Sequence, residues 1–289
     1  MAPSRSSSST QLLIIDPQND FCDLPEAWCP TDPTGGASIA PALPVAGAHA
    51  DLQRLAAFIR DAAGALDEIT VTLDSHNRLH IAHPTFWQRG DGADVAPFTP
   101  ITAADVRSGA YRPRDAAAAD RALAYLDALE ARGRYTLMVW PVHCEIGSWG
   151  HGVHAAVRAA YNAWETTRLK VVRKVAKGSN LWTEHYSALQ AEVPVADDPD
   201  TLLNTRLLAA LDRADTLIVA GEAGSHCVKS TVLDLADHLP GGRLERLVLL
   251  TDCMSPVTGF QAQHDAFLRD MAARGARLST AAETLARLR

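Results

Sequence analysis

The chain has 289 residues, of which 47% are hydrophobic, and a formal net charge of −7 at pH 7. This length and composition suffice for one α/β domain with a full core. We do not expect nucleic acid as a partner, because the chain is acidic and binding to phosphate backbones needs clustered Lys and Arg. The longest apolar stretches have the length of strands, well short of the ~20 residues that cross a bilayer, so no membrane partner is expected.

The N-terminal segment 1–10 is rich in Ser and lacks the apolar core of a secretory signal. We therefore expect a disordered tail over 1–10, followed by one domain over 11–289, in a cytoplasmic protein. The five cysteines are scattered without a CxxC spacing, which is typical of a reducing compartment.

Short apolar runs then alternate with longer amphipathic segments. We predict strands at 11–15, 69–73, 136–140, 169–173, 217–221 and 247–251. We predict helices at 52–63, 115–131, 153–164, 202–211 and 227–238, and two more that start at Gln261 and Ala281. This alternation predicts a doubly wound, Rossmann-like, mostly parallel sheet flanked by helices. The segments 23–47 and 84–131 are too long for ordinary connections, and we interpret both as insertions near the pocket.

Chemically useful side chains follow five of the predicted strands. In chain order they are Asp16, the pair Asp74 and His76, His143, the pair Lys174 and Lys177, and Cys227. The carboxyl ends of parallel strands line up along one edge of a sheet, where ligands bind. The sequence therefore predicts a single site built from all five strand ends.

Cys227 follows a strand and a short turn and opens a helix, so the helix N-terminus is expected to favour its thiolate, as in a nucleophile. The alternative is a small buried cysteine with a structural role. Asp16 could take the proton of the thiol and return it to a leaving amine, or it could simply cap a turn. Lys177 could neutralise that carboxylate, with Lys174 as the competing choice.

Asp74 and His76 stand two residues apart, and His143 arrives from the next predicted strand. One carboxylate and two imidazoles are a common set for a divalent metal such as zinc, iron or manganese. His80 and His83 are candidates for further ligands or for loop caps. Asp74, His76 and His143 could also serve an iron-dependent oxygenase. That interpretation gives no role to Asp16, Lys177 and Cys227.

Five motifs occur in a fixed order. They are D-P-Q-N-D-F at Asp16, D-S-H at Asp74 with the later His80, W-P-V-H-C at Trp140, K-G at Lys177 followed by Y-S-A-L at Tyr186, and G-E-A-G-S-H-C-V-K-S-T at Gly221. In this order the chain resembles the isochorismatase-like cysteine hydrolase superfamily, and within it the nicotinamidase and pyrazinamidase branch. The resemblance covers most of the chain, from Gln11 to about Thr258.

This resemblance implies a role for each matching residue. The implied catalytic triad is Asp16, Lys177 and Cys227, and the implied metal ligands are Asp74, His76 and His143. The resemblance also places Phe21 and Trp140 beside the substrate ring, Tyr186 near the pocket wall, and an oxyanion hole at the backbone amides of Ala223 and Cys227. It further implies a cis peptide bond between Glu222 and Ala223.

The implied activity is hydrolysis of a small ring carboxamide, foremost nicotinamide to nicotinate and ammonia, through a Cys227 thioester and with one divalent metal ion, zinc being the first expectation. Another small amide, maleamate-like or carbamoyl, is the alternative within the superfamily. A non-catalytic member would be expected to lose triad or metal residues, which this chain keeps. Homo-oligomers are common in this fold class.

Three features depart from the pattern of the family. Glu222 replaces the usual aliphatic residue of its turn, Ser75 stands where an aromatic residue is commoner, and the inserted segment 84–131 is longer than usual. These departures bear on the substrate more than on the chemistry.

Overall fold

The computed structural model describes residues 8–289. Most of the predicted tail, 1–10, lies outside the described residues, and Thr10 is already the first residue of a strand. No helix among residues 8–289 is long and apolar enough to span a lipid bilayer.

A six-stranded sheet with the order β10-β9-β8-β1-β2-β7 forms the centre of the molecule, and every neighbouring pair in it is parallel. Its strands are β1 (Thr10–Ile15), β2 (Glu68–Asp74), β7 (Arg173–Lys177), β8 (Thr216–Gly221), β9 (Leu247–Leu250) and β10 (Arg277–Ser279). The predicted fold class is confirmed: this is a doubly wound α/β domain.

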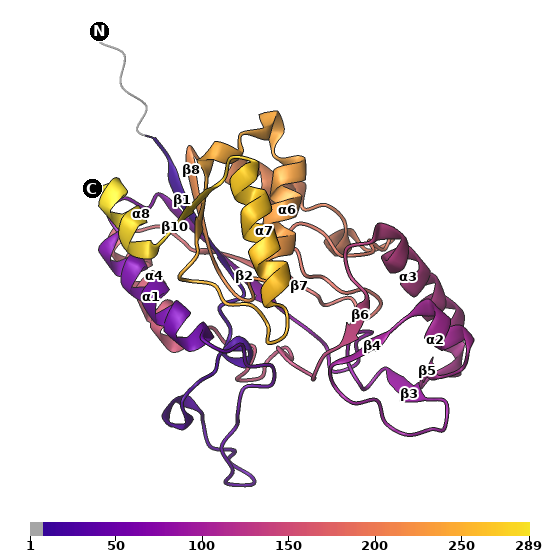
Figure 1. Cartoon of the computed structure of the whole chain (residues 1–289). Helices are drawn as coiled ribbons and strands as arrows, with labels where there is room; N and C mark the ends of the chain where they lie inside the picture. The colour runs from indigo at the N-terminus through magenta and orange to yellow at the C-terminus, as the bar shows by residue number, and fades with distance from the viewer. Residues whose placement is uncertain (1–7) are drawn as a thin grey trace.

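Helices cover both faces of the sheet (Figure 1). One face carries α1 (Ala48–Asp61), α4 (Ala155–Arg168) and α8 (Ala281–Leu288), and the other carries α5 (Thr205–Asp212), α6 (Cys227–His238) and α7 (Gln261–Ala273). Successive strand residues point to opposite faces, so in β1 Leu12 and Ile14 join one core while Leu13 and Ile15 join the other. Burial on both faces explains why the central strands are continuously apolar.

The inserted segment forms a separate lobe beside the sheet (Figure 1). It contains β3 (Trp87–Arg89), β4 (Thr99–Ile101), α2 (Ala103–Arg107), β5 (Tyr111–Pro113) and α3 (Ala119–Arg132). Short 3-10 helices are found here and in loops elsewhere, at Asn19–Phe21, Glu26–Trp28, Ala116–Ala118, Pro199–Thr201, Pro240–Gly242 and Leu244–Arg246.

The predicted strand 136–140 does not belong to the parallel sheet. Its core, β6 (Leu137–Val139), pairs antiparallel with β4 of the insertion. The run is apolar because Leu137 and Val139 pack into the core against Leu126 and Leu129 of α3, and not because two faces of a sheet cover it. His143 therefore reaches the site from a two-stranded ribbon.

The strand predicted at 169–173 is displaced along the chain, since β7 runs from Arg173 to Lys177. Leu169 and Val171 are 90% and 85% exposed, so the apolar run that suggested a strand lies in solvent. As an edge strand, β7 is only half covered and carries a mixed sequence. The displacement places Lys177 at the last position of the strand, in register with Asp74 of β2.

The topology also fixes where a ligand can bind. From β1 the chain moves to β2 and β7 in one direction, and later through β8, β9 and β10 in the other. The sheet therefore has a switch point between β1 and β8, where α/β proteins of this type hold their ligands. Asp16 directly follows β1, and Cys227 follows β8 after a short turn.

Gly221, the last residue of β8, is predicted to be indispensable for this junction. Its φ is +117°, and a Cβ there would collide with the backbone carbonyl of Ile15. We expect Gly221→Ala to lower the free energy of unfolding by about 3 kcal/mol, because strain and overpacking add together. Gly64, with nothing near its Cβ position, is the control, and Gly64→Ala should change stability by less than about 1 kcal/mol. Equal denaturation midpoints for the two variants would contradict this account.

Candidate active site

The three residues of the implied triad lie together at the switch point. The Nζ of Lys177 is 2.8 Å from Oδ2 of Asp16 and 3.6 Å from the Sγ of Cys227. All three side chains are buried. Lys174, the competing choice, lies elsewhere: its amine faces Glu165, at 3.8 Å, and the ring of Tyr161.

Two hydrogen bonds to the hydroxyl of Thr72 hold Asp16 in place. Thr72 of β2 donates its hydroxyl to Oδ1 at 2.5 Å and accepts the Asp16 backbone N–H at 3.0 Å. Asp16 adopts a φ of 40°, a conformation that non-glycine residues rarely take and that turns the chain at the end of β1. Burial raises the pKa of Asp16 against the opposing attraction of Lys177, so this carboxylate is disposed to accept a proton.

Cys227 is the first residue of α6. Burial raises the pKa of its thiol well above the usual value, and the nearby Lys177 charge only partly opposes this effect. A base is needed, and Asp16 is among the groups that interact with this thiol.

The turn between β8 and α6 carries two free backbone donors. Within the described residues, the N–H groups of Ala223 and Cys227 donate to no protein acceptor. The carbonyl of Ala223 faces the helix instead and accepts from the N–H groups of His226 and Val228. The peptide bond between Glu222 and Ala223 is cis, as expected. This geometry fits an oxyanion hole at the two predicted amides.

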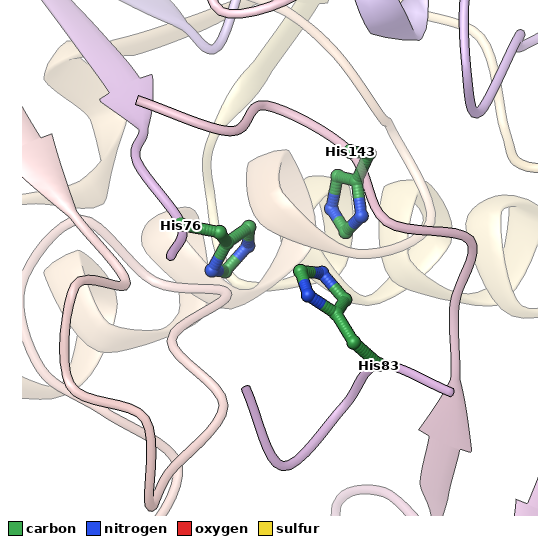
Figure 2. Close-up of side chains that lie close together, drawn as sticks. All are labelled: His76, His83 and His143. Carbon is green, nitrogen blue, oxygen red and sulfur yellow. The ribbon is translucent and has the colours of Figure 1, made fainter. Parts of the chain in front are cut away.

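Three histidines from two loops converge next to the triad: His76 and His83 from the loop after β2, and His143 from the loop after β6 (Figure 2). One ring nitrogen each of His76, His83 and His143 lies within 4.8 Å of the others. In His76 and His143, Nδ1 is bound to a backbone carbonyl, that of Gly178 at 2.9 Å and that of Pro141 at 2.8 Å. Such bonds fix the tautomer and turn Nε2 inward, as in metal-binding histidines.

Asp74 joins the histidines to the triad. Its Oδ2 lies 2.9 Å from Nε2 of His76 and 3.3 Å from Nε2 of His143, while Oδ1 lies 3.1 Å from Nζ of Lys177. The glycine of the K-G motif is explained here, because a Cβ on Gly178 would come within 2.8 Å of the His76 ring. The predicted ligands Asp74, His76 and His143 are thus brought together, and they fit a divalent cation.

The two further candidate ligands, His80 and His83, differ in their hydrogen-bond partners. Both ring nitrogens of His80 are engaged by the backbone: Nε2 by the carbonyl of Thr183 at 3.1 Å, and Nδ1 by the N–H of Ala82 at 3.1 Å. His83 places Nδ1 3.3 Å from the Arg78 carbonyl and leaves its buried Nε2 without a partner. An orphaned nitrogen beside the other imidazoles fits a metal ligand, so His83 is the better candidate than His80 for a further ligand.

A narrow, mostly apolar pocket lies beside Cys227. Its walls include the three predicted substrate-binding residues, Phe21, Trp140 and Tyr186, and also Asp74, His143 and Ala223 of the groups above. Trp140 donates its indole N–H to the Tyr186 hydroxyl at 3.0 Å, which fixes both rings. The aromatic, narrow shape suits a small planar molecule.

Two polar residues of the pocket, Glu184 and His226, were not predicted from the sequence. Glu184 lines the pocket beside Asp74 and His143, and burial raises the pKa of its carboxyl group. His226 precedes the nucleophile and packs edge-on against Trp140, with ring centroids 5.2 Å apart. Glu184 sits in an irregular loop, where no periodic pattern marks it; its place seven residues after Lys177 was the only available signal.

Comparison with known proteins agrees with this fold. Residues 187–283 match the family model described as "Isochorismatase domain". No curated protein sequence matches the chain. Among solved structures, a nicotinamidase/pyrazinamidase of Acinetobacter baumanii shares 18% identity at a TM-score of 0.60, over 97% of this chain and 100% of that chain. The yeast nicotinamidase bound to the inhibitor nicotinaldehyde shares 19% identity at a TM-score of 0.60, over 94% and 99%.

A pyrazinamidase of Pyrococcus horikoshii in complex with zinc shares 17% identity at a TM-score of 0.51, over 94% of this chain and 99% of that chain. At these identities the structures show a common fold. The fold and the family match together confirm the resemblance to isochorismatase-like hydrolases, and nicotinamidases and pyrazinamidases are the structures of this fold that it resembles.

The two histidines give a direct test of the metal site. We expect His83→Ala to weaken zinc binding at least ~10-fold, because it removes the unpartnered Nε2 from the cluster. His80→Ala is the matched control from the same loop, and it should keep the wild-type affinity. Chelator competition and the zinc content of the purified protein measure both. A loss with His80→Ala and none with His83→Ala would reverse the assignment.

Proposed function

We propose that the chain is a cysteine amidohydrolase of a small ring carboxamide, with nicotinamide as the first candidate. The observation that carries the proposal is the position of Lys177. Its ammonium lies against Asp16, Cys227 and Asp74, and so it joins a nucleophile–base pair to a set of metal ligands at the end of one pocket. The fold shared with nicotinamidases supports the same activity.

The first step is attack by the thiol. Cys227 transfers its proton to Asp16 as its sulfur forms a bond to the amide carbon, because the buried thiol does not ionise by itself. The carbonyl oxygen gains the negative charge and accepts hydrogen bonds from the amides of Ala223 and Cys227. The loss of one such donor costs about 3 kcal/mol in other enzymes.

The second step releases ammonia. The tetrahedral intermediate collapses, the C–N bond breaks, and the leaving nitrogen takes the proton from Asp16. The acyl group remains on Cys227 as a thioester. A water molecule then attacks the thioester while Asp16 accepts its proton, and the return of that proton to the sulfur restores the thiol as the carboxylic acid leaves. Lys177 keeps its positive charge throughout, because the carboxylates around it raise its pKa in spite of burial.

The residues that would hold a divalent cation are His76, His143, Asp74 and His83. When bound, a cation such as zinc supplies a Lewis acid that can anchor a ring nitrogen or orient water. The protein's own part is to hold the substrate ring between Phe21 and Trp140 and its amide over Cys227. The oxygenase alternative would use the cation alone, and it leaves the triad without a role.

The activity is tested by the release of ammonia from nicotinamide. We expect Cys227→Ala to lower kcat at least ~10⁴-fold, because no other group in the pocket replaces the nucleophile. Cys29→Ala, a change at a partly exposed cysteine outside the pocket, should leave the rate unchanged. Undiminished turnover by the Cys227→Ala protein would refute the scheme, and a panel of maleamate-like and carbamoyl amides would show whether another substrate is preferred.

Thr72 provides a finer test of the base. We expect Thr72→Val to lower kcat by ~10-fold, because it removes the hydroxyl that holds Oδ1 of Asp16 and accepts its N–H. Thr72→Ser keeps the hydroxyl and should retain at least about half of the activity. Steady-state ammonia release distinguishes the two, and equal rates for Val and Ser would show that this contact does not orient the base.

A further inference from the structure

The turn that presents the Ala223 amide is held by a side chain outside the pocket. Glu222 is fully buried, and its Oε2 accepts the backbone N–H of Ser255 at 3.1 Å. The carbonyl of the same Ser255 accepts the N–H of Gly224 at 2.8 Å. Ser255 therefore binds the turn on both sides of Ala223. Glu222 has no part in the triad, the pocket wall or the metal set, and an aliphatic residue is the usual one at this place.

Ser255 also reaches a second buried carboxyl group. Its hydroxyl donates to Oδ2 of Asp51 on α1 at 2.5 Å, and Asp51 is only 3% exposed. Glu222 and Asp51 are thus two buried acids joined through one serine, and each is close enough to shift the pKa of the other. Together they connect α1 to the junction of β8 and α6.

The cluster of Glu222, Asp51 and Ser255 has more acidic groups than positive charges to neutralise them. Among the described residues, Arg54 is the one cation paired with either acid; it contacts Asp51, and its side chain is 47% exposed. Asp23 adds a further negative field, and Oε1 of Glu222 has no hydrogen-bond partner in the protein. Two buried carboxylates beside one screened cation cannot both stay ionised at low cost. Burial, with the Asp51 charge, raises the pKa of Glu222 well above its usual value.

The carboxyl and thiol groups around the cluster do not supply the missing charge. Asp20 and Asp252 add only negative charge to the loop side and to the segment after β9. Cys22 and Cys253 stay neutral because burial raises the pKa of each thiol. On the α7 side, the ring of His264 occupies the space where a Cβ on Gly224 would lie.

We propose that Glu222 and Asp51 share one proton and, through Ser255, fix the turn that presents the Ala223 amide to the reacting carbonyl oxygen. Glu222 is in this view a positioning residue for the oxyanion hole. The inference rests on the proposed function, since the Ala223 amide matters only if acyl transfer occurs at Cys227. An apolar side chain at position 222 would fix the turn by packing alone. With Glu222, the position of the turn depends on the proton shared with Asp51.

Kinetics with two variants separate this role from mere packing. Glu222→Gln keeps a donor for Asp51 and an acceptor for Ser255, so kcat for nicotinamide should stay within ~3-fold of wild type. Glu222→Val keeps only apolar bulk, so kcat should fall at least ~10-fold while KM changes less than ~3-fold. Inhibition by nicotinaldehyde, whose oxygen becomes an oxyanion when a thiol adds to it, should weaken in parallel with kcat.

Glu192→Gln is the matched control, because Glu192 is a buried glutamate that lies apart from the turn, beside Arg134. It should leave both kcat and the inhibition by nicotinaldehyde unchanged. Equal kcat and inhibition for Glu222→Val and Glu222→Gln, or a loss in KM alone, would overturn the positioning role.

Thermal unfolding as a function of pH tests the shared proton without any substrate. A raised pKa in the folded state means that stability is fully present below the unfolded pKa of ~4.5 and is lost as the pH rises through the folded pKa. Glu222→Gln cannot lose this proton. The Tm of Glu222→Gln minus the Tm of wild type should therefore increase by about 3 °C or more from pH 5 to pH 9.

A Tm difference that is constant with pH would overturn the shared proton. If the wild-type protein does not hydrolyse nicotinamide or bind nicotinaldehyde, the proposed function fails instead. The pH dependence of Tm then still decides whether Glu222 and Asp51 share a proton.

Discussion

The contact of one buried ammonium with three acidic groups is the constraint on which the rest of the site depends. Lys177 lies 2.8 Å from Asp16 and 3.1 Å from Asp74, with the sulfur of Cys227 at 3.6 Å. Each buried ion carries a desolvation penalty of several kcal/mol, which only close pairing repays. Without Lys177, the two carboxylates would repel each other and one would take up a proton. The base and the metal ligand would then no longer have separate charge states.

Strand register places this ammonium. Asp74 and Lys177 are the last residues of β2 and β7 and are direct partners in the parallel ladder. Asp16 follows the end of β1 on the same side of the switch point, and Cys227 comes from across it, after β8 and a short turn. The triad is therefore carried by β8, β1 and β7 of one sheet, with β2 between β1 and β7. Its distances are set by backbone hydrogen bonds and not by flexible loops, as the preorganisation of a catalytic group requires.

The central part of this arrangement could be predicted from the sequence because strand ends carry their own signal. Buried apolar runs followed by a chemically useful residue predicted that Asp16, Asp74 and Cys227 meet at one edge of the sheet, and the structure brings them together there. The same signal failed where apolar residues have another cause. The run at 136–140 is buried by the insertion, and the run at 169–172 includes the solvent-exposed Leu169. Edge strands and inserted ribbons are determined by tertiary contacts, which a local pattern does not contain.

The distinction between His80 and His83 was equally beyond the sequence, because it depends on which ring nitrogens the backbone already engages. Both are buried, and they stand three positions apart in the same loop. Carbonyl and amide groups of Thr183 and Ala82 saturate His80, whereas Nε2 of His83 is left over. Residue type and spacing suggest a ligand, but only the hydrogen-bond inventory of the folded chain assigns one.

Two pairs of buried carboxyl groups now flank the same catalytic turn, and they differ in what neutralises them. Asp16 and Asp74 share the buried Lys177, so both can stay ionised until Asp16 accepts the thiol proton. Among the described residues, the one cation paired with Glu222 or Asp51 is the half-exposed Arg54, whose charge is screened by water. A shared proton therefore neutralises this pair in our proposal. A proton shared between two acids is directional and short-ranged, and it therefore fixes geometry where an ammonium would mainly balance charge. The first pair suits proton transfer in the reaction, and the second suits holding an amide still while the reaction proceeds.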